Sequence, residues 1–143
     1  MFAVMDRVPF GPLISGYFGG ESYFAVECAY ASRYASPPMG RPNADGECAV
    51  ILFACCVSPL PYVITRKDDY DVSRCEENGY SQFYAKEKEG SKSLMPRYNA
   101  HFVPVKDTFP FDFQACSNIV AEGHELVLHH KWSLPIAVLW YKR

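Results

Sequence analysis

The sequence predicts an α+β fold in which a mostly antiparallel sheet dominates and the helices are short. Its apolar runs are of strand length and rich in β-branched and aromatic residues, as at 49–57, 125–129 and 134–140. Glycine and proline separate these runs, and no stretch predicts a helix longer than about three turns. With 143 residues, 49% of them hydrophobic and 15% aromatic, the chain is expected to form one domain over residues 1–143.

The first half of the chain predicts short strands around one helix. Residues 1–4 favour a short strand, and 23–25 favour an aromatic strand that leads into an alanine-rich helix. Residues 36–46 have the prolines and glycines of a loop. Residues 49–57 form a continuous apolar run, typical of a central strand buried on both faces, and 62–65 are expected to continue it or pair with it.

The second half begins with a polar stretch and ends with two strands. Residues 67–92 hold most of the charge and predict turns and short irregular segments. Residues 98–104 favour a short strand, and 109–113 are aromatic at alternate positions, as in a strand edge or a pocket wall. Residues 125–129 and 134–140 are predicted to be the last two strands. Along the first, Glu125, Val127 and His129 are expected to share one face, with Leu126 and Leu128 on the other.

Charge and composition exclude several classes of function. The chain has 14 basic and 16 acidic residues, a net charge of −2 and no basic run, so no direct nucleic-acid binding is indicated. The chain is uncharged from Cys48 to Thr65, but Pro59 and Pro61 would break a membrane-spanning helix. A buried strand that ends in a proline turn is therefore expected there, with no membrane contact.

The cysteines and the start of the chain bear on the compartment. The six cysteines, at positions 28, 48, 55, 56, 75 and 116, include no Cys-x-x-Cys pair. Residues 1–5 are followed at once by Asp6 and Arg7, unlike a secretory leader. We expect an intracellular protein, cytoplasmic or nuclear, whose cysteines are reduced and mostly buried.

The chemically suggestive stretch runs from Gly16 to Ala35. Its glycines permit a tight loop, the strand 23–25 follows, and Tyr34 lies eleven residues after Tyr23. Two tyrosines presented from a glycine loop and the helix behind it could clamp a flat ring between them. Aromatic residues at this spacing are also common in ordinary cores.

This stretch resembles the donor-loop core of the poly(ADP-ribose) polymerase family, whose usual form is Gly-x-Gly-x-Tyr-Phe-Ala and then a small-residue helix ending in a second tyrosine. Gly19, the Tyr-Phe-Ala triplet 23–25 and the spacing to Tyr34 match this form, with Tyr30 inside the helix. Two positions depart from it. Glu21 stands in place of the second glycine, and Ala31 stands where a small hydroxyl residue is usual, with Ser32 beside it.

The end of the chain carries a second similarity to the same family. Residues 124–128 and 133–141 are similar to its closing pair of strands, the first of which carries the catalytic glutamate, here Glu125. Gly123 stands where the toxin-like transferases have the first glutamate of a Glu-x-Glu pair. The resemblance therefore favours the polymerase-like branch, which uses tyrosines and one glutamate.

The resemblance implies an ADP-ribosyltransferase fold, a split sheet pair with a nucleotide cleft between its halves. It implies NAD as co-substrate, release of nicotinamide, and transfer of ADP-ribose to an acceptor, most naturally a protein. Tyr23 and Tyr34 would sandwich the nicotinamide ring, and Glu125 would bond the ribose 2′-hydroxyl. The implied NAD-binding residues are Gly19, Tyr23, Phe24, Ala25, Ser32 and Tyr34.

Family members also carry a His-Gly pair upstream, and no histidine precedes Tyr23 here. The resemblance thus implies a catalytic domain without its leading strand and helix, with weak NAD binding and a sheet edge open to self-association. Two alternatives stay open. One is a module of the same fold, catalytically weak or inactive, that binds NAD, ADP-ribose or a protein. The other is a metal site formed by Cys116, His124, His129 and His130, although their spacing fits no common zinc pattern.

Overall fold

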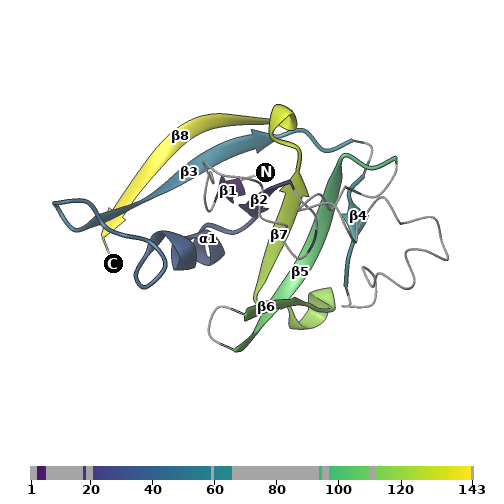
Figure 1. Ribbon diagram of the computed structural model, residues 1–143, viewed down its shortest axis with the longest axis horizontal. Coiled ribbons are helices and arrows are strands. Elements are labelled where there is room, and N and C mark those ends of the chain that lie inside the picture. The colour runs from purple at the N-terminus through teal and green to yellow at the C-terminus, as the bar shows by residue number, and fades with distance from the viewer. Residues whose placement is uncertain are drawn as a thin grey trace, which may run out of the picture.

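The computed structural model describes residues 3–5, 18, 21–58, 60–65, 94, 97–109 and 112–142. These residues form eight strands, one α-helix and two short 3-10 helices (Figure 1). The elements are β1 (Ala3–Met5), β2 (Ser22–Ala25), α1 (Cys28–Ala35), β3 (Glu47–Cys55), β4 (Tyr62–Val63), β5 (Ala100–Phe109), β6 (Asp112–Ala115), η3 (Asn118–Val120), β7 (Gly123–Leu128), η4 (His130–Trp132) and β8 (Ser133–Lys142).

Hydrogen bonding joins the strands in one sheet in the order β4-β5-β7-β2-β1-β3-β8, and β6 pairs with β5. Every pairing is antiparallel except that of β4 with β5. The α+β class and the mostly antiparallel sheet are therefore confirmed. The sheet twists strongly, so that β3 and β8 run across Figure 1 while β5 and β7 run steeply. Short β1 and β2 lie between these two groups of long strands.

Two buried clusters divide the core between the faces of the sheet. On β7, Val127 belongs to one cluster, whereas Leu126 and Leu128 belong to the other. This confirms the alternation expected along 125–129, since neighbouring side chains of a strand point to opposite faces. The helix contributes Tyr30 and Ala31 to the cluster of Val127, so α1 covers that face of the sheet.

The prediction for the apolar run at 49–57 was partly wrong. Strand β3 begins at Glu47 and is fully buried at only three positions, Cys48 and Val50 before a register shift against β8 and Phe53 after it. Val50 and Phe53 are three residues apart and therefore point to opposite faces, so they enter different core clusters; the extra residue at the register shift is Ile136 of β8.

Residues 62–65 also differ from expectation. Strand β4, Tyr62–Val63, does not pair with β3 but lies parallel to β5, with Tyr62 opposite His101. The strand predicted over 98–104 is longer than expected, because β5 continues to Phe109 to pair with β6. The polar stretch 67–92 lies outside the described residues.

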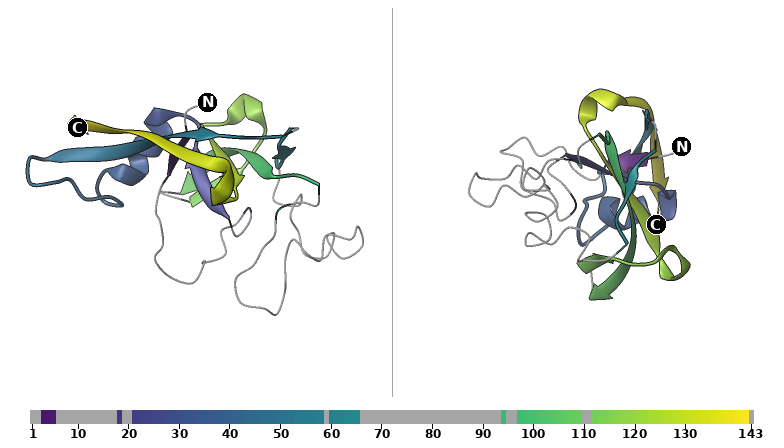
Figure 2. Two further views of the ribbon diagram at one scale, coloured as in Figure 1. Left: turned by 90° about the horizontal axis from the view of Figure 1, so that it is seen from above. Right: turned by 90° about the vertical axis from the view of Figure 1, so that its right-hand side faces the viewer.

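The last strand is the exposed edge of the sheet. Strands β3 and β8 extend together away from the shorter strands (Figure 2), and β8 pairs only with β3 among the described strands. Large apolar side chains of β8 are exposed on both faces: Leu134, Ile136, Val138, Leu139 and Trp140. No described helix has both the length and the apolar character needed to cross a membrane.

The described cysteines are all free thiols, as predicted, but their expected burial was wrong. Only Cys48 is buried, Cys55 and Cys116 are half-buried, and Cys28 and Cys56 are exposed. Cys28 opens helix α1 and Cys56 follows the end of β3, so neither lies within the core-facing part of its element.

Candidate functional site

Helix α1 presents its tyrosines on one side because of their spacing. Tyr30 and Tyr34 are four residues apart, so they lie one turn above the other on the same helix face. Alanines between and around them favour the helix. The helix ends at Ala35 and is capped by Ser36, whose side-chain hydroxyl donates to the Ser32 carbonyl at 2.7 Å. Pro37 follows the cap.

The helix face, strand β2 and strand β7 enclose a pocket of about 130 Å³. A cavity of roughly this size, about 150 Å³, holds one benzene ring in a protein core. The volume of the pocket is therefore close to that of a cavity that holds a single six-membered ring. Its lining residues are Tyr23, Phe24, Ala25, Tyr30, Ala31, Tyr34 and Glu125.

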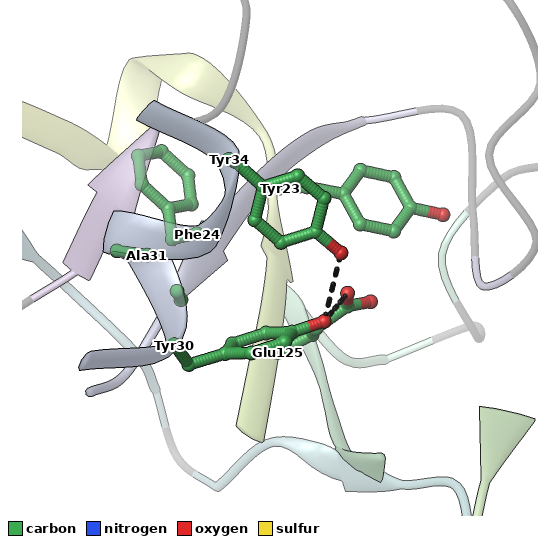
Figure 3. A pocket seen from close by; sticks show the side chains of 7 residues that line it. Tyr23, Phe24, Tyr30, Ala31, Tyr34 and Glu125 are labelled. Atoms are coloured by element: carbon green, nitrogen blue, oxygen red, sulfur yellow. Dashed lines mark hydrogen bonds between the residues drawn. The ribbon is translucent and has the colours of Figure 1, made fainter. Parts of the chain in front are cut away.

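A chain of hydrogen bonds crosses this pocket. The Tyr30 hydroxyl donates to Glu125 Oε1 at 2.6 Å and lies 2.9 Å from the Tyr34 hydroxyl (Figure 3). The two tyrosine rings meet nearly at right angles, 82° between planes, with centroids 5.5 Å apart. Together they form a corner whose polar tips point at the carboxylate.

Electrostatics keeps Tyr30 protonated. Its burial, followed by the nearby Glu125 carboxylate and Tyr34, raises the pKa of the Tyr30 hydroxyl well above its usual range. The hydroxyl is therefore a hydrogen-bond donor at any working pH. Glu125 is 9% exposed, so this donor stabilises a carboxylate that has little contact with water.

Small residues make the space in which this arrangement fits. A Cβ atom on Gly123 would lie 2.6 Å from the Tyr30 ring, so glycine allows the ring to lie directly against β7. On β2, Ala25 is the cross-strand partner of Glu125. Its short side chain leaves room beside the carboxylate, where a larger residue would fill the pocket.

The hydroxyl of Tyr23 has a different role. In Figure 3 it points away from Glu125. It accepts a hydrogen bond from the Phe18 amide at 2.8 Å, while His101 Nδ1 lies 2.6 Å from the Phe18 carbonyl. These two contacts hold Phe18, which lies within the predicted glycine loop, against the pocket face of the sheet.

His101 is neutral in this position. It is fully buried, and this burial lowers the pKa of its imidazole to about 4. Because a carbonyl oxygen only accepts, the Nδ1 atom carries the proton and donates it to Phe18.

A second set of contacts ties the start of α1 to β7 on the opposite face. Both carboxylate oxygens of Glu27 bind His124, one the backbone amide at 2.9 Å and the other the ring Nδ1. The Val26 amide donates to the His124 carbonyl at 2.9 Å. Since His124 precedes Glu125, these bonds fix the helix relative to the carboxylate.

Five of the seven predicted site residues gather at the pocket, namely Tyr23, Phe24, Ala25, Tyr34 and Glu125. The ring of Phe24, however, packs edge-on against Phe53 in the core, with centroids 5.2 Å apart. Gly19 lies outside the described residues.

Ser32 is a correction, because its side chain does not reach the pocket. Its hydroxyl donates to the Ala29 carbonyl within the helix, and Ala31 is the residue that lines the pocket. The sequence analysis missed Tyr30 as a site residue. Its position one turn before Tyr34 indicated that the two tyrosines share a helix face. Its hydrogen-bond partner Glu125, however, lies 95 positions further along the chain.

The proposed metal ligands are dispersed. His124 is bound by Glu27 and by Asn118, while the tilted rings of His129 and His130 contact each other at the start of η4. Within the described ranges, no three histidine, cysteine or acidic side chains are placed to hold a metal ion. Comparison with known proteins found no matching family model, no matching characterised protein and no matching solved structure.

Proposed function

We propose that this chain is an NAD-dependent ADP-ribosyltransferase, which releases nicotinamide and transfers ADP-ribose to a protein acceptor. One observation carries the proposal. Tyr23, Tyr34 and Glu125, which the sequence resemblance nominates from opposite ends of the chain, line one pocket of single-ring size. The proposal extends to the fold, which we assign to the ADP-ribosyltransferase type.

The chemistry of the reaction suits these residues. Cleavage of the bond between nicotinamide and ribose develops positive charge on the sugar, as in glycoside hydrolysis. A carboxylate at the sugar stabilises that charge, and aromatic walls fix the direction in which the ring leaves. Glu125 is the carboxylate in this assignment, and Tyr23 and Tyr34 are the walls.

The surrounding structure supports preorganisation of this site. Tyr30 donates to one oxygen of Glu125 at 2.6 Å, which orients the carboxylate before any ligand arrives. Helix α1, which carries Tyr30 and Tyr34, is fixed on β7 by Glu27. The reactive groups therefore sit on regular elements that hold them in place.

A second candidate function is a binding module that does not turn NAD over. The same Tyr30–Glu125 hydrogen bond favours it, because a hydroxyl already on the carboxylate competes with a ribose hydroxyl for Oε1. In this case the pocket would bind NAD or ADP-ribose and present it to a partner without cleavage.

Labelled NAD distinguishes the two functions. Purified protein is incubated with NAD labelled in the adenylate part, and label on protein and free nicotinamide are measured together. Transfer predicts both products in the wild type and neither with Glu125→Gln. A binding module predicts saturable NAD binding by calorimetry with no nicotinamide release. Absence of both binding and release contradicts both candidates.

A further inference from the structure

We propose that two copies of this chain pair through strand β8, so that the sheet continues from one copy into the other across a two-fold axis. The pairing involves no residue that lines the pocket, so it goes beyond the proposed function and does not depend on it. Three features of β8 support it: an ordered open edge, a segment without the usual obstacles to pairing, and a sequence that complements itself in antiparallel orientation.

Strand β8 is an open edge that is held in place. Among the described strands it pairs only with β3, so no described strand meets the backbone groups on its other side. The Tyr141 hydroxyl fixes the far end of β8, because it donates to the Ser32 carbonyl at 3.1 Å and lies 2.9 Å from the Ser36 hydroxyl. An ordered edge of this kind is a template for another strand, and it has little entropy left to lose on pairing.

The usual obstacles to edge pairing occupy only the first part of β8. Pro135 lacks a backbone donor, and Ile136 is the extra residue at the register shift against β3. From Ala137 to Lys142, in contrast, the pairing with β3 is regular. Natural sheet edges are protected by prolines, bulges and charges, and the segment from Ala137 to Tyr141 contains none of these.

This open segment complements itself when a second copy runs antiparallel to it. With the two-fold axis at Leu139, each Trp140 lies opposite Val138 of the second copy, and each Ala137 lies opposite Tyr141. Pairs of an aromatic and a β-branched residue are favourable across antiparallel strands. Val138 and Trp140 are 50% and 57% exposed, so both have apolar surface to bury in such a pair.

Charge is compatible with a second copy in this register. Lys142 is the only charged residue of β8. The two lysines would lie at opposite ends of the paired segment, about 20 Å apart along the strands, which is more than the screening length at physiological salt. A strand with a single terminal charge has little electrostatic preference for an acidic or a basic peptide, whereas its apolar centre matches that of an identical strand.

The exposed apolar surface of β8 indicates how strongly the two copies would associate. Its five large exposed apolar side chains are 45–67% exposed. At roughly 200 Å² for a fully exposed large side chain, they present on the order of 500 Å² in each copy. Two copies can therefore bury about 1,000 Å² in total, near the lower limit for a specific interface. We expect a dimer that dissociates at micromolar concentration.

Sedimentation equilibrium on the full chain tests the association between roughly 1 and 200 μM. The average mass should rise from the 16.2 kDa of one chain toward twice that value. Hydrogen exchange at the β8 amides should slow over the same range, because pairing protects them. A constant mass of 16.2 kDa at all concentrations, or association without added protection of β8, overturns the inference.

Opposite charges at one position test whether the partner is a second copy. In the proposed register Leu139 lies opposite itself, so Leu139→Lys and Leu139→Glu should each weaken association about tenfold or more. An equimolar mixture of the two variants should restore it, because each pair then joins a lysine to a glutamate. Val120→Lys is the matched control and should associate like the wild type. Val120 is 48% exposed, against 45% for Leu139, and lies on η3, which precedes β7 whereas η4 and β8 follow it.

Circular dichroism shows whether each variant is folded before the masses are compared. Leu139 variants that associate like the wild type, or a mixture that stays monomeric, contradict pairing through β8 in this register. An equal loss of association in Val120→Lys contradicts a specific role of β8. Hydrogen exchange of the wild type needs no substitution, so it decides the question even if a variant does not fold.

Discussion

Replacement of Tyr30 by phenylalanine isolates the hydrogen bond on which the site geometry depends. The change removes the hydroxyl that donates to Glu125 at 2.6 Å but retains the ring that packs against Gly123. A hydrogen bond to a charged group contributes roughly 1.5–3 kcal/mol, and its loss leaves a nearly buried carboxylate without this donor. We therefore expect Tyr30→Phe to lower the free energy of unfolding by about 2 kcal/mol at neutral pH.

Urea denaturation measures this loss, and an unchanged slope with denaturant would show that the compactness of both states is preserved. A double-mutant cycle with Glu125→Gln tests the partner. Once Glu125 is neutral, the Tyr30 hydroxyl should be worth only about 1 kcal/mol, so the two changes should be non-additive. If Tyr30→Phe lowers the free energy of unfolding by less than about 0.5 kcal/mol, and its effect adds strictly to that of Glu125→Gln, Tyr30 does not hold the carboxylate.

Three further perturbations test the surroundings of the site. Gly123→Ala should destabilise the fold by about 1–3 kcal/mol in urea denaturation, because its methyl group would overlap the Tyr30 ring; a neutral effect would contradict the observed packing. The pKa of His101 is about 4 in the folded state and near 6.5 in the unfolded state. The contribution of neutral His101 to the free energy of unfolding is therefore full above about pH 6.5 and decreases by about 3 kcal/mol as the pH drops to about 4. Denaturation measured across this pH range should show the decrease, and His101→Asn should make it smaller. An unchanged dependence of stability on pH in the variant would contradict a buried neutral histidine. Glu27→Ala should accelerate hydrogen exchange at the His124 amide, which donates to that carboxylate at 2.9 Å, and unchanged protection would argue against the tie between α1 and β7.

Local features of the site could be predicted from the sequence because they depend on residues that are neighbours in the chain. The strand at 23–25 and the helix behind it follow from aromatic and alanine-rich stretches, and both are present as β2 and α1. The alternation along 125–129 correctly placed Glu125 and Val127 on the same face. An i, i+4 pair such as Tyr30 and Tyr34 shares a helix face for the same local reason.

Features that depend on pairing between strands far apart in the sequence could not be predicted from it. The apolar run at 49–57 could not reveal that β3 pairs with β8 or that this pairing contains a register shift, because β8 comes from the other end of the chain. The parallel pairing of β4 with β5 likewise has no local signal. The bond between Tyr30 and Glu125 exists only because β2 pairs with β7 and brings α1 over the carboxylate.

The most direct test of the proposed function is nicotinamide release from NAD by the wild type, Glu125→Gln and Glu122→Gln. All three proteins should fold alike, since each change replaces one oxygen by an amide nitrogen. We predict release by the wild type and by Glu122→Gln, and a loss of about a hundredfold or more in Glu125→Gln, the scale of one lost transition-state contact. Equal rates in all three proteins, or no release by the wild type, would contradict the assignment of Glu125 as the catalytic carboxylate.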